Sequence, residues 1–154
     1  MKWRIFILLI IVIAGMLSFT SNSPQDEFEF HESLSEYKFF IGKMSELQPA
    51  SGILEYDLNT PLFSNYAEKL RFIKVPAGSK IYYNDTAVFE MPKGTVLIKN
   101  FYYWNDFRQQ KKGRKIIETR LLVHRSDGWA TYQYIWNEAQ TEAVFEPIGD
   151  AITV

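Results

Sequence analysis

The chain has 154 residues, of which 47% are hydrophobic and 16% aromatic, with 17 basic side chains against 18 acidic ones and no cysteine. This length and composition suit one domain with its own core, whereas a formal charge near zero gives no field that attracts nucleic acid. The absence of cysteine excludes disulfides, thiolate catalysis, cysteine-bound zinc and covalent haem attachment through a C-x-x-C-H motif.

The N-terminus has the pattern of an export signal. Lys2 and Arg4 precede an apolar run over residues 5–17. This run is shorter than the roughly 20 residues that cross a bilayer as a helix, and its flanks are typical of a secretory signal peptide. Residues 1–20 are therefore expected to be a signal peptide or an uncleaved anchor, with residues 5–20 in the inner membrane in the second case. Either outcome places the chain in the periplasm or cell envelope.

The following residues predict a tether and then one folded domain. Residues 21–33 are polar and acidic and contain Pro24, a composition typical of a flexible tether. Residues 34–154 are expected to form a single β-rich domain. At its start, Ser33 and Glu36 have the spacing of a capping box, which predicts one short helix.

After Gly52 the sequence has the rhythm of an all-β fold. Segments rich in β-branched and aromatic residues alternate with Gly, Pro and Asn-Asp signals. We expect a mainly antiparallel fold, sandwich-like or a partly open barrel. Residues 105–115, with five basic side chains, are predicted to be a long hairpin loop. The predicted strands cover residues 53–57, 69–75, 80–83, 95–104, 116–125, 129–137 and 143–146.

One hairpin can be predicted in detail. Asp127-Gly128 is a pair that tolerates positive φ, so a two-residue turn is expected to pair Ser126 with Trp129. The side chains that this register places on the core side are Thr119, Leu121 and Val123 opposite Trp136, Tyr134 and Tyr132. The other side, facing water or a partner, is predicted to carry Glu118, Arg120, Leu122 and His124 opposite Asn137, Ile135, Gln133 and Thr131.

Functional candidates are few. Tyr102, Tyr103 and Trp104 end a predicted strand and provide a candidate aromatic rim for a carbohydrate or small ligand. The loop around Arg108 is either a solvated tip or a docking site for an acidic partner. No metal site is expected from His31 and His124, because no carboxylate has ligand spacing beside them.

An enzyme is the third alternative. Glu55, Asp57 and Glu118 are the carboxylates that could form the pair of a glycoside hydrolase mechanism, yet the sequence sets no distance between them. Ser64 lacks the G-x-S-x-G context of a hydrolase nucleophile, and no phosphate-binding glycine loop is present. We therefore expect no catalytic activity and no cofactor bound by this chain.

Four stretches resemble the non-haem N-terminal region of exported bacterial diheme c-type cytochromes. They are YDLNTPLFSNYAEKLRFIKVPAG (56–78), MPKGTVLIKNFYY (91–103), IETRLLVHRSDGW (117–129) and YIWNEAQTEA (134–143). In that family the haem-binding half would follow the last of these stretches, so no haem ligand carries over to this chain. Residues that match without an assigned role are Asp57, Asn59, Ser64, Lys69, Arg71, Glu118, Arg120 and Asn137.

The resemblance implies an electron-transfer context. We expect a non-catalytic exported domain that docks with a periplasmic c-type cytochrome or an exported dehydrogenase. Contact with a membrane is expected only through an uncleaved N-terminal segment, and nucleic acid is not expected as a partner. The candidate interaction residues are Tyr102, Trp104, Arg108, Glu118, Arg120 and Asn137.

Overall fold

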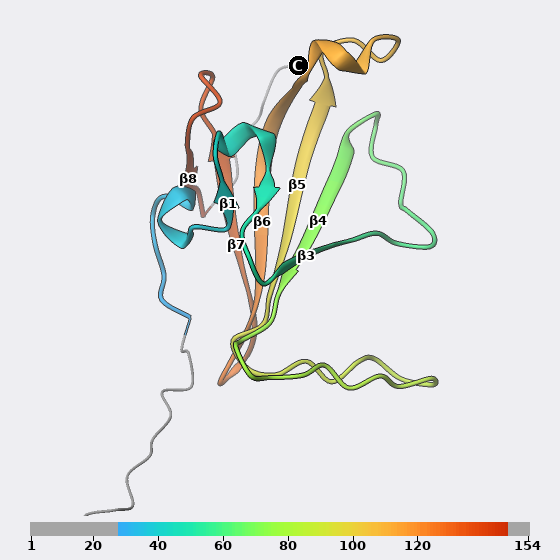
Figure 1. Cartoon of the computed structure of the whole chain (residues 1–154), viewed down its shortest axis with the longest axis vertical. Coiled ribbons are helices and arrows are strands. Elements are labelled where there is room, and N and C mark those ends of the chain that lie inside the picture. Colours follow the sequence, from blue (N-terminus) through green and yellow to red (C-terminus); the bar gives the residue numbers. More distant parts are fainter. Residues whose placement is uncertain (1–27, 148–154) are drawn as a thin grey trace, which may run out of the picture.

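A computed structural model describes residues 28–147, so the predicted signal or anchor and most of the predicted tether lie outside the described residues. The described chain is mainly antiparallel β, as predicted. Its principal element is a six-stranded sheet in which every strand pairs with its neighbour in the chain. Figure 1 shows its long central strands running the length of the molecule. The strands are β3 (Ile53–Tyr56), β4 (Glu68–Lys74), β5 (Val96–Trp104), β6 (Arg114–Arg125), β7 (Gly128–Trp136) and β8 (Ala143–Phe145).

Residues 80–83 are not the strand that was predicted. The only pairing there is an isolated bridge between Tyr82 and Glu90, and Tyr82 and Tyr83 remain 65% and 78% exposed. A two-stranded ribbon without a third strand or a covering layer buries little apolar surface. Residues 76–94 instead form an arm that projects from one end of the sheet (Figure 1).

The predicted register of the β6–β7 hairpin is wrong by two residues. Ser126 and Asp127 occupy the turn, so Arg125 pairs with Gly128 and Leu121 with Tyr132. Among the residues of this turn, only Gly128 has a positive φ, at 129°. This pattern matches a turn with negative φ at its central residues followed by a glycine bulge. Because side chains alternate with a period of two, a shift of two leaves the paired side chains of β6 and β7 on their predicted faces. Asn137, predicted on the outer face, lies beyond the end of β7.

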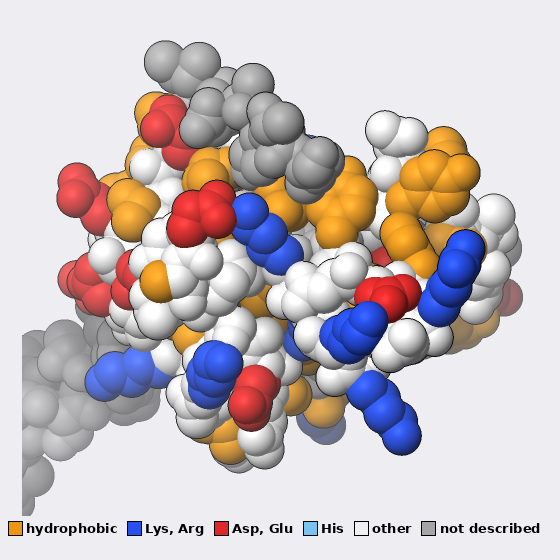
Figure 2. Space-filling model, turned by 90° about the horizontal axis from the view of Figure 1, so that it is seen from above, with side chains coloured by type: hydrophobic (Ala, Val, Ile, Leu, Met, Phe, Trp, Pro, Cys, Tyr) orange, Lys and Arg blue, Asp and Glu red, His pale blue; other side chains and the backbone are white. Residues whose placement is uncertain are grey.

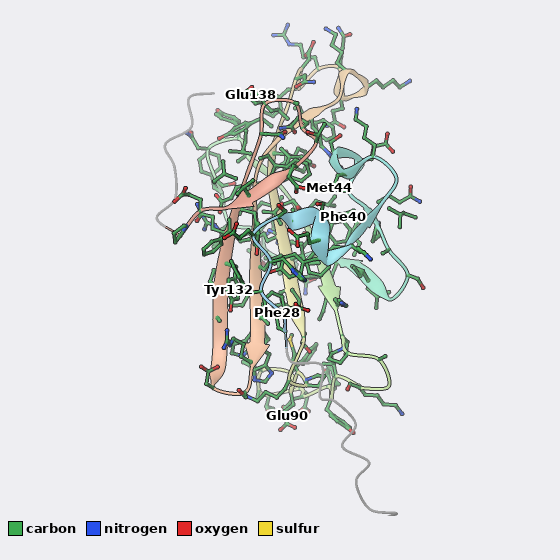
Figure 3. All side chains as sticks on the ribbon, turned by 90° about the vertical axis from the view of Figure 1, so that its left-hand side faces the viewer. Phe28, Phe40, Met44, Glu90, Tyr132 and Glu138 are labelled. Carbon is green, nitrogen blue, oxygen red and sulfur yellow. The ribbon has the colours of Figure 1, made fainter. Side chains whose placement is uncertain are left out.

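The N-terminal segment covers one face of the sheet. It contains the 3-10 helix η1 (Leu34–Tyr37), where a short helix was predicted, although Ser33 makes no side-chain cap. A small antiparallel sheet, β1 (Phe40–Ile41) with β2 (Gln48–Pro49), follows around the 3-10 helix η2 (Met44–Glu46). Figure 3 shows Phe28, Phe40 and Met44 along the sheet, between ends marked by Glu138 and Glu90.

This layer and the sheet enclose the core. Phe40 packs edge-on against Phe72 of β4, with ring centroids 5.4 Å apart. The Tyr37 and Tyr134 hydroxyls are 2.8 Å apart, and Tyr134 donates to the His31 carbonyl at 2.7 Å. Burial is the first cause of the raised pKa of the Tyr134 phenol, followed by its hydrogen bond with Tyr37. The fully buried large apolar side chains are Leu34, Leu47, Phe72, Ile98, Ile116, Leu121, Val123 and Tyr134.

Hydrogen bonds between buried side chains join the central strands across the core. Trp136 Nε1 donates to Thr119 Oγ1 at 2.9 Å, Thr119 Oγ1 donates to Asn100 Oδ1 at 2.6 Å, and Asn100 Nδ2 donates to the Leu70 carbonyl at 3.2 Å. Thr119 and Asn100 are fully buried. Thr95 is equally buried, but its hydroxyl has no hydrogen-bond partner within the described residues.

These two threonines give a matched test of the core. We expect Thr119→Val to lower the free energy of unfolding by about 1–3 kcal/mol, because it leaves the Trp136 and Asn100 groups unpaired. Thr95→Val should be neutral or stabilise the fold by up to about 1 kcal/mol, because it replaces an unpaired buried hydroxyl with a methyl group. Urea unfolding measures both, and equal destabilisation by the two substitutions would contradict this assignment.

Candidate functional site

The second face of the six-stranded sheet carries no covering layer within residues 28–147. Leu54, Leu122 and Trp129 on this face are 66%, 36% and 45% exposed. We call it the open face. Its cross-strand rows follow from the register: Lys69, Phe101, Glu118 and Ile135 in one row; Tyr56, Arg71, Lys99, Arg120 and Gln133 in the next; and Leu54, Ile73, Leu97, Leu122 and Thr131 in the third.

A row of cations crosses the open face. Arg71, Lys99 and Arg120 are direct neighbours on β4, β5 and β6, and Lys69 lies two residues before Arg71 on β4. Arg71 is buried, at 5% exposed, whereas the other three remain partly or fully exposed. Like charges placed directly opposite in a sheet destabilise it. Burial is the main cause that lowers the pKa of Lys99, and the charges of Arg71, Lys69 and Arg120 lower it further. The fold therefore tolerates an electrostatic cost at this place.

Two carboxylates and one ring offset part of this cost. Arg71 donates to Asp57 Oδ1 at 3.0 Å, and Arg120 forms an ion pair with Glu118. The Phe101 ring receives both Lys99 Nζ, at 4.7 Å from its centroid, and the Arg120 guanidinium, at 5.1 Å. Four cations against two carboxylates leave a positive surplus on the open face.

Each end of the open face is bounded by a projecting segment. At one end, residues 57–67 fold back so that Lys69 donates to the Leu62 carbonyl at 2.6 Å. A hollow of about 460 Å³ lies there, between Lys69, Arg71 and the loop. At the other end, His124 Nδ1 lies 2.8 Å from the Met91 carbonyl at the base of the arm, and its ring stacks on Trp129. Figure 1 shows the loop and the arm leaving opposite ends of the sheet on the same side.

The structure brings together two of the six candidate interaction residues. Glu118 and Arg120 lie on the open face, whereas Tyr102 lies on the core side and is 8% exposed. Trp104 packs edge-on against Tyr102, with ring centroids 5.2 Å apart. The Arg114 guanidinium lies over the Tyr102 ring, 4.8 Å from its centroid. Tyr102 and Trp104 therefore do not form an exposed platform on which a sugar could stack.

The remaining two candidates lie at the end of the sheet near residues 57–67. Arg108 is exposed in the β5–β6 loop, where its backbone amide donates to Asp106 Oδ1. Asn137 closes the β7–β8 turn, accepting from the Thr141 amide at 3.0 Å. Both lie off the open face.

Gln140 has a structural role that sequence reasoning missed. Its side-chain amide accepts from the Ile116 amide at 2.6 Å and donates to the Ile116 carbonyl at 2.9 Å. These bonds meet β6 where its pairing with β5 shifts, between Phe101–Glu118 and Tyr102–Ile116. Such a bulge leaves backbone groups without a ladder partner. The WNEAQT stretch therefore supports the sheet.

The cationic row was also missed by sequence reasoning. Lys99 was not singled out, and Lys69 and Arg71 were noted without a role. The alternation of β4, β5 and β6 indicates which side chains share a face, but a row exists only once the register is known. The available signal was a basic residue at an outward position in three consecutive strands.

Other site chemistries find little support in the described part of the chain. Within residues 28–147 no group of three or more His, Asp or Glu side chains is placed to hold a metal ion. Asp57 and Glu118 each pair with an arginine. No helix among these residues has the length and apolar character to cross a membrane.

Comparisons with protein families, curated proteins and solved structures found no match.

The crowding of cations predicts a measurable titration. Arg120→Gln removes one positive neighbour and frees Glu118, and both effects favour the protonated amine, so the pKa of Lys99 should rise. Lysine side-chain NMR over a pH series measures this pKa. Arg108→Gln, which removes a cation off the open face, should leave it unchanged. A Lys99 pKa that does not respond to Arg120→Gln would contradict the assigned row.

Proposed function

We propose that this chain is a non-catalytic exported domain, with a sandwich-like core, that docks an acidic partner protein on its open face. The observation that carries the proposal is the group of Lys69, Lys99 and Arg120 on a sheet face without a covering layer among residues 28–147, beside Arg71, which is only 5% exposed and is paired with Asp57. Complementary charge speeds encounter and selects the partner. The surplus of cations on this face is complementary to carboxylates on the surface of a partner protein.

The neighbouring rows give this face the composition of an interface. Leu54, Leu97 and Leu122 form an apolar strip directly beside the cationic row. An apolar centre flanked by charged and polar groups is the usual arrangement of a protein interface. The hollow beside Lys69 and Arg71, which Asp57 and Glu68 also line, has room for a projecting polar side chain of the partner.

The resemblance points to the class of partner. Three of the four matching stretches supply the open face: residues 56–78 contain Lys69 and Arg71, residues 91–103 contain Lys99, and residues 117–129 contain Arg120. We therefore propose a periplasmic c-type cytochrome or an exported dehydrogenase as the partner, with the haem or redox cofactor held by that protein. The export signal predicted for residues 1–20 supports the same compartment.

The test is a capture experiment with charge reversals. The full chain, immobilised and exposed to periplasmic extract of its host, should retain a protein with a haem absorption spectrum or dehydrogenase activity. Lys69→Glu with Lys99→Glu should abolish retention, because it turns an attractive face repulsive. Raising the salt concentration should weaken retention by the unchanged chain.

The matched control keeps the same change in net charge at another place. Lys43→Glu with Lys80→Glu reverses two exposed cations that lie off the open face. This control should retain the partner as well as the unchanged chain does, with thermal melting confirming that all variants fold. The proposal fails if no redox protein is retained, or if both double variants lose it equally.

A further inference from the structure

A second exposed surface lies at the end of the sheet where residues 57–67 and the β5–β6 loop meet. Tyr66 contacts Phe63 and Phe107, with ring centroids 6.0 Å apart in both pairs. Leu62 lies beside them in the same loop. We call these four side chains the apolar tip; they are 80% (Leu62), 82% (Phe63), 68% (Tyr66) and 53% (Phe107) exposed. A contiguous exposed cluster of large apolar side chains usually marks an interaction site.

The backbone presents these side chains in a held conformation. Asn65 and Tyr66 have positive φ, at 48° and 66°, which costs free energy for residues with a Cβ. The turn is closed by two bonds between Ser64 and Ala67, at 2.7 and 2.8 Å. Lys69 fixes the loop through the Leu62 carbonyl. These hydrogen bonds therefore hold Tyr66 in its outward position, although its positive φ is unfavourable in free energy.

Cations flank the apolar tip. In the β5–β6 loop, Asp106 is engaged by Lys112 at 2.8 Å, and this bond is the first cause that lowers the pKa of the Asp106 carboxyl. Arg108 and Lys111 have no side-chain partner within residues 28–147 and are exposed. Figure 2, which views the molecule from this end, shows hydrophobic side chains with Lys, Arg and also acidic side chains beside them.

We propose that the apolar tip, with Arg108 and Lys111, binds the surface of an anionic lipid bilayer. Leucine and aromatic side chains insert at the boundary between headgroups and acyl chains. Neighbouring cations attract anionic headgroups, with a roughly fivefold gain in affinity for each basic residue. Leu62, Phe63 and Tyr66 also line the hollow beside Lys69 and Arg71, so contact of the tip with lipid closes that hollow. The long strands run away from this end (Figure 1), so the rest of the open face stays accessible to a protein partner while the tip contacts lipid.

The arm at the opposite end provides an internal contrast. Tyr83 and Val88 are 78% and 86% exposed, which matches the exposure of the tip. The charges around them are balanced, however, because Lys80 and Lys93 are accompanied by Asp85 and Glu90. Apolar exposure without a surplus of cations favours a protein contact over an anionic bilayer. The arm is therefore a matched control for the tip.

The experiment reads the contact locally, because an apolar N-terminus can bind lipid by itself. Full-length chains carrying Phe63→Trp or Tyr83→Trp are mixed with vesicles of equimolar phosphatidylglycerol and brominated phosphatidylcholine. Bromine quenches only an indole that reaches the acyl chains. The Phe63→Trp chain should show quenching beyond that of the unchanged chain, and the Tyr83→Trp chain should show none.

Charge dependence completes the test. Arg108→Gln with Lys111→Gln, added to Phe63→Trp, should weaken the additional quenching, with a roughly fivefold loss of apparent affinity for each cation removed. These four positions are exposed, so the variants should fold, which circular dichroism checks. The proposal is overturned if the Phe63→Trp chain is quenched no more than the unchanged chain. It is equally overturned if the Tyr83→Trp chain is quenched as strongly, or if the two Gln substitutions have no effect.

Discussion

The structure depends on the packing of one short N-terminal segment against one face of a six-stranded sheet. A sheet needs at least one face buried to be stable, and here Leu34, Phe39 and Leu47 supply the opposing layer. No other part of the described chain forms a second layer. The core face therefore takes the large aromatic side chains, and the opposite face is left for solvent or a partner.

This constraint explains why the two faces differ in chemistry. On the core face the Trp136, Thr119 and Asn100 side chains satisfy one another, as buried polar groups must. On the open face Arg71, Lys99 and Arg120 stand side by side with too few carboxylates to neutralise them. A purely structural surface gains nothing from this crowding, which is why we place the interaction site there.

Local sequence pattern was sufficient for the six strands of the main sheet and for the faces of the paired residues in the β6–β7 hairpin, but not for residues 80–83, for β1 and β2, or for the site. The register of that hairpin was misplaced because Asp127-Gly128 was assigned to the turn, whereas Gly128 begins β7. Its side chains kept their predicted faces because the error was even. The row from Arg71 to Lys99 joins strands separated by the arm, and no local signal reports such a pairing. The burial of Tyr102 likewise needed the alternation of β5 against a known core.

The central claim is that the open face contacts the partner, and zero-length cross-linking tests it most directly. A carbodiimide joins lysines to carboxylates only where the two are in contact, and mass spectrometry identifies the joined residues. In the captured complex, Lys69 and Lys99 should be joined to acidic residues of the partner. Cross-links confined to Lys43, Lys80 or Lys93 would contradict docking on the open face.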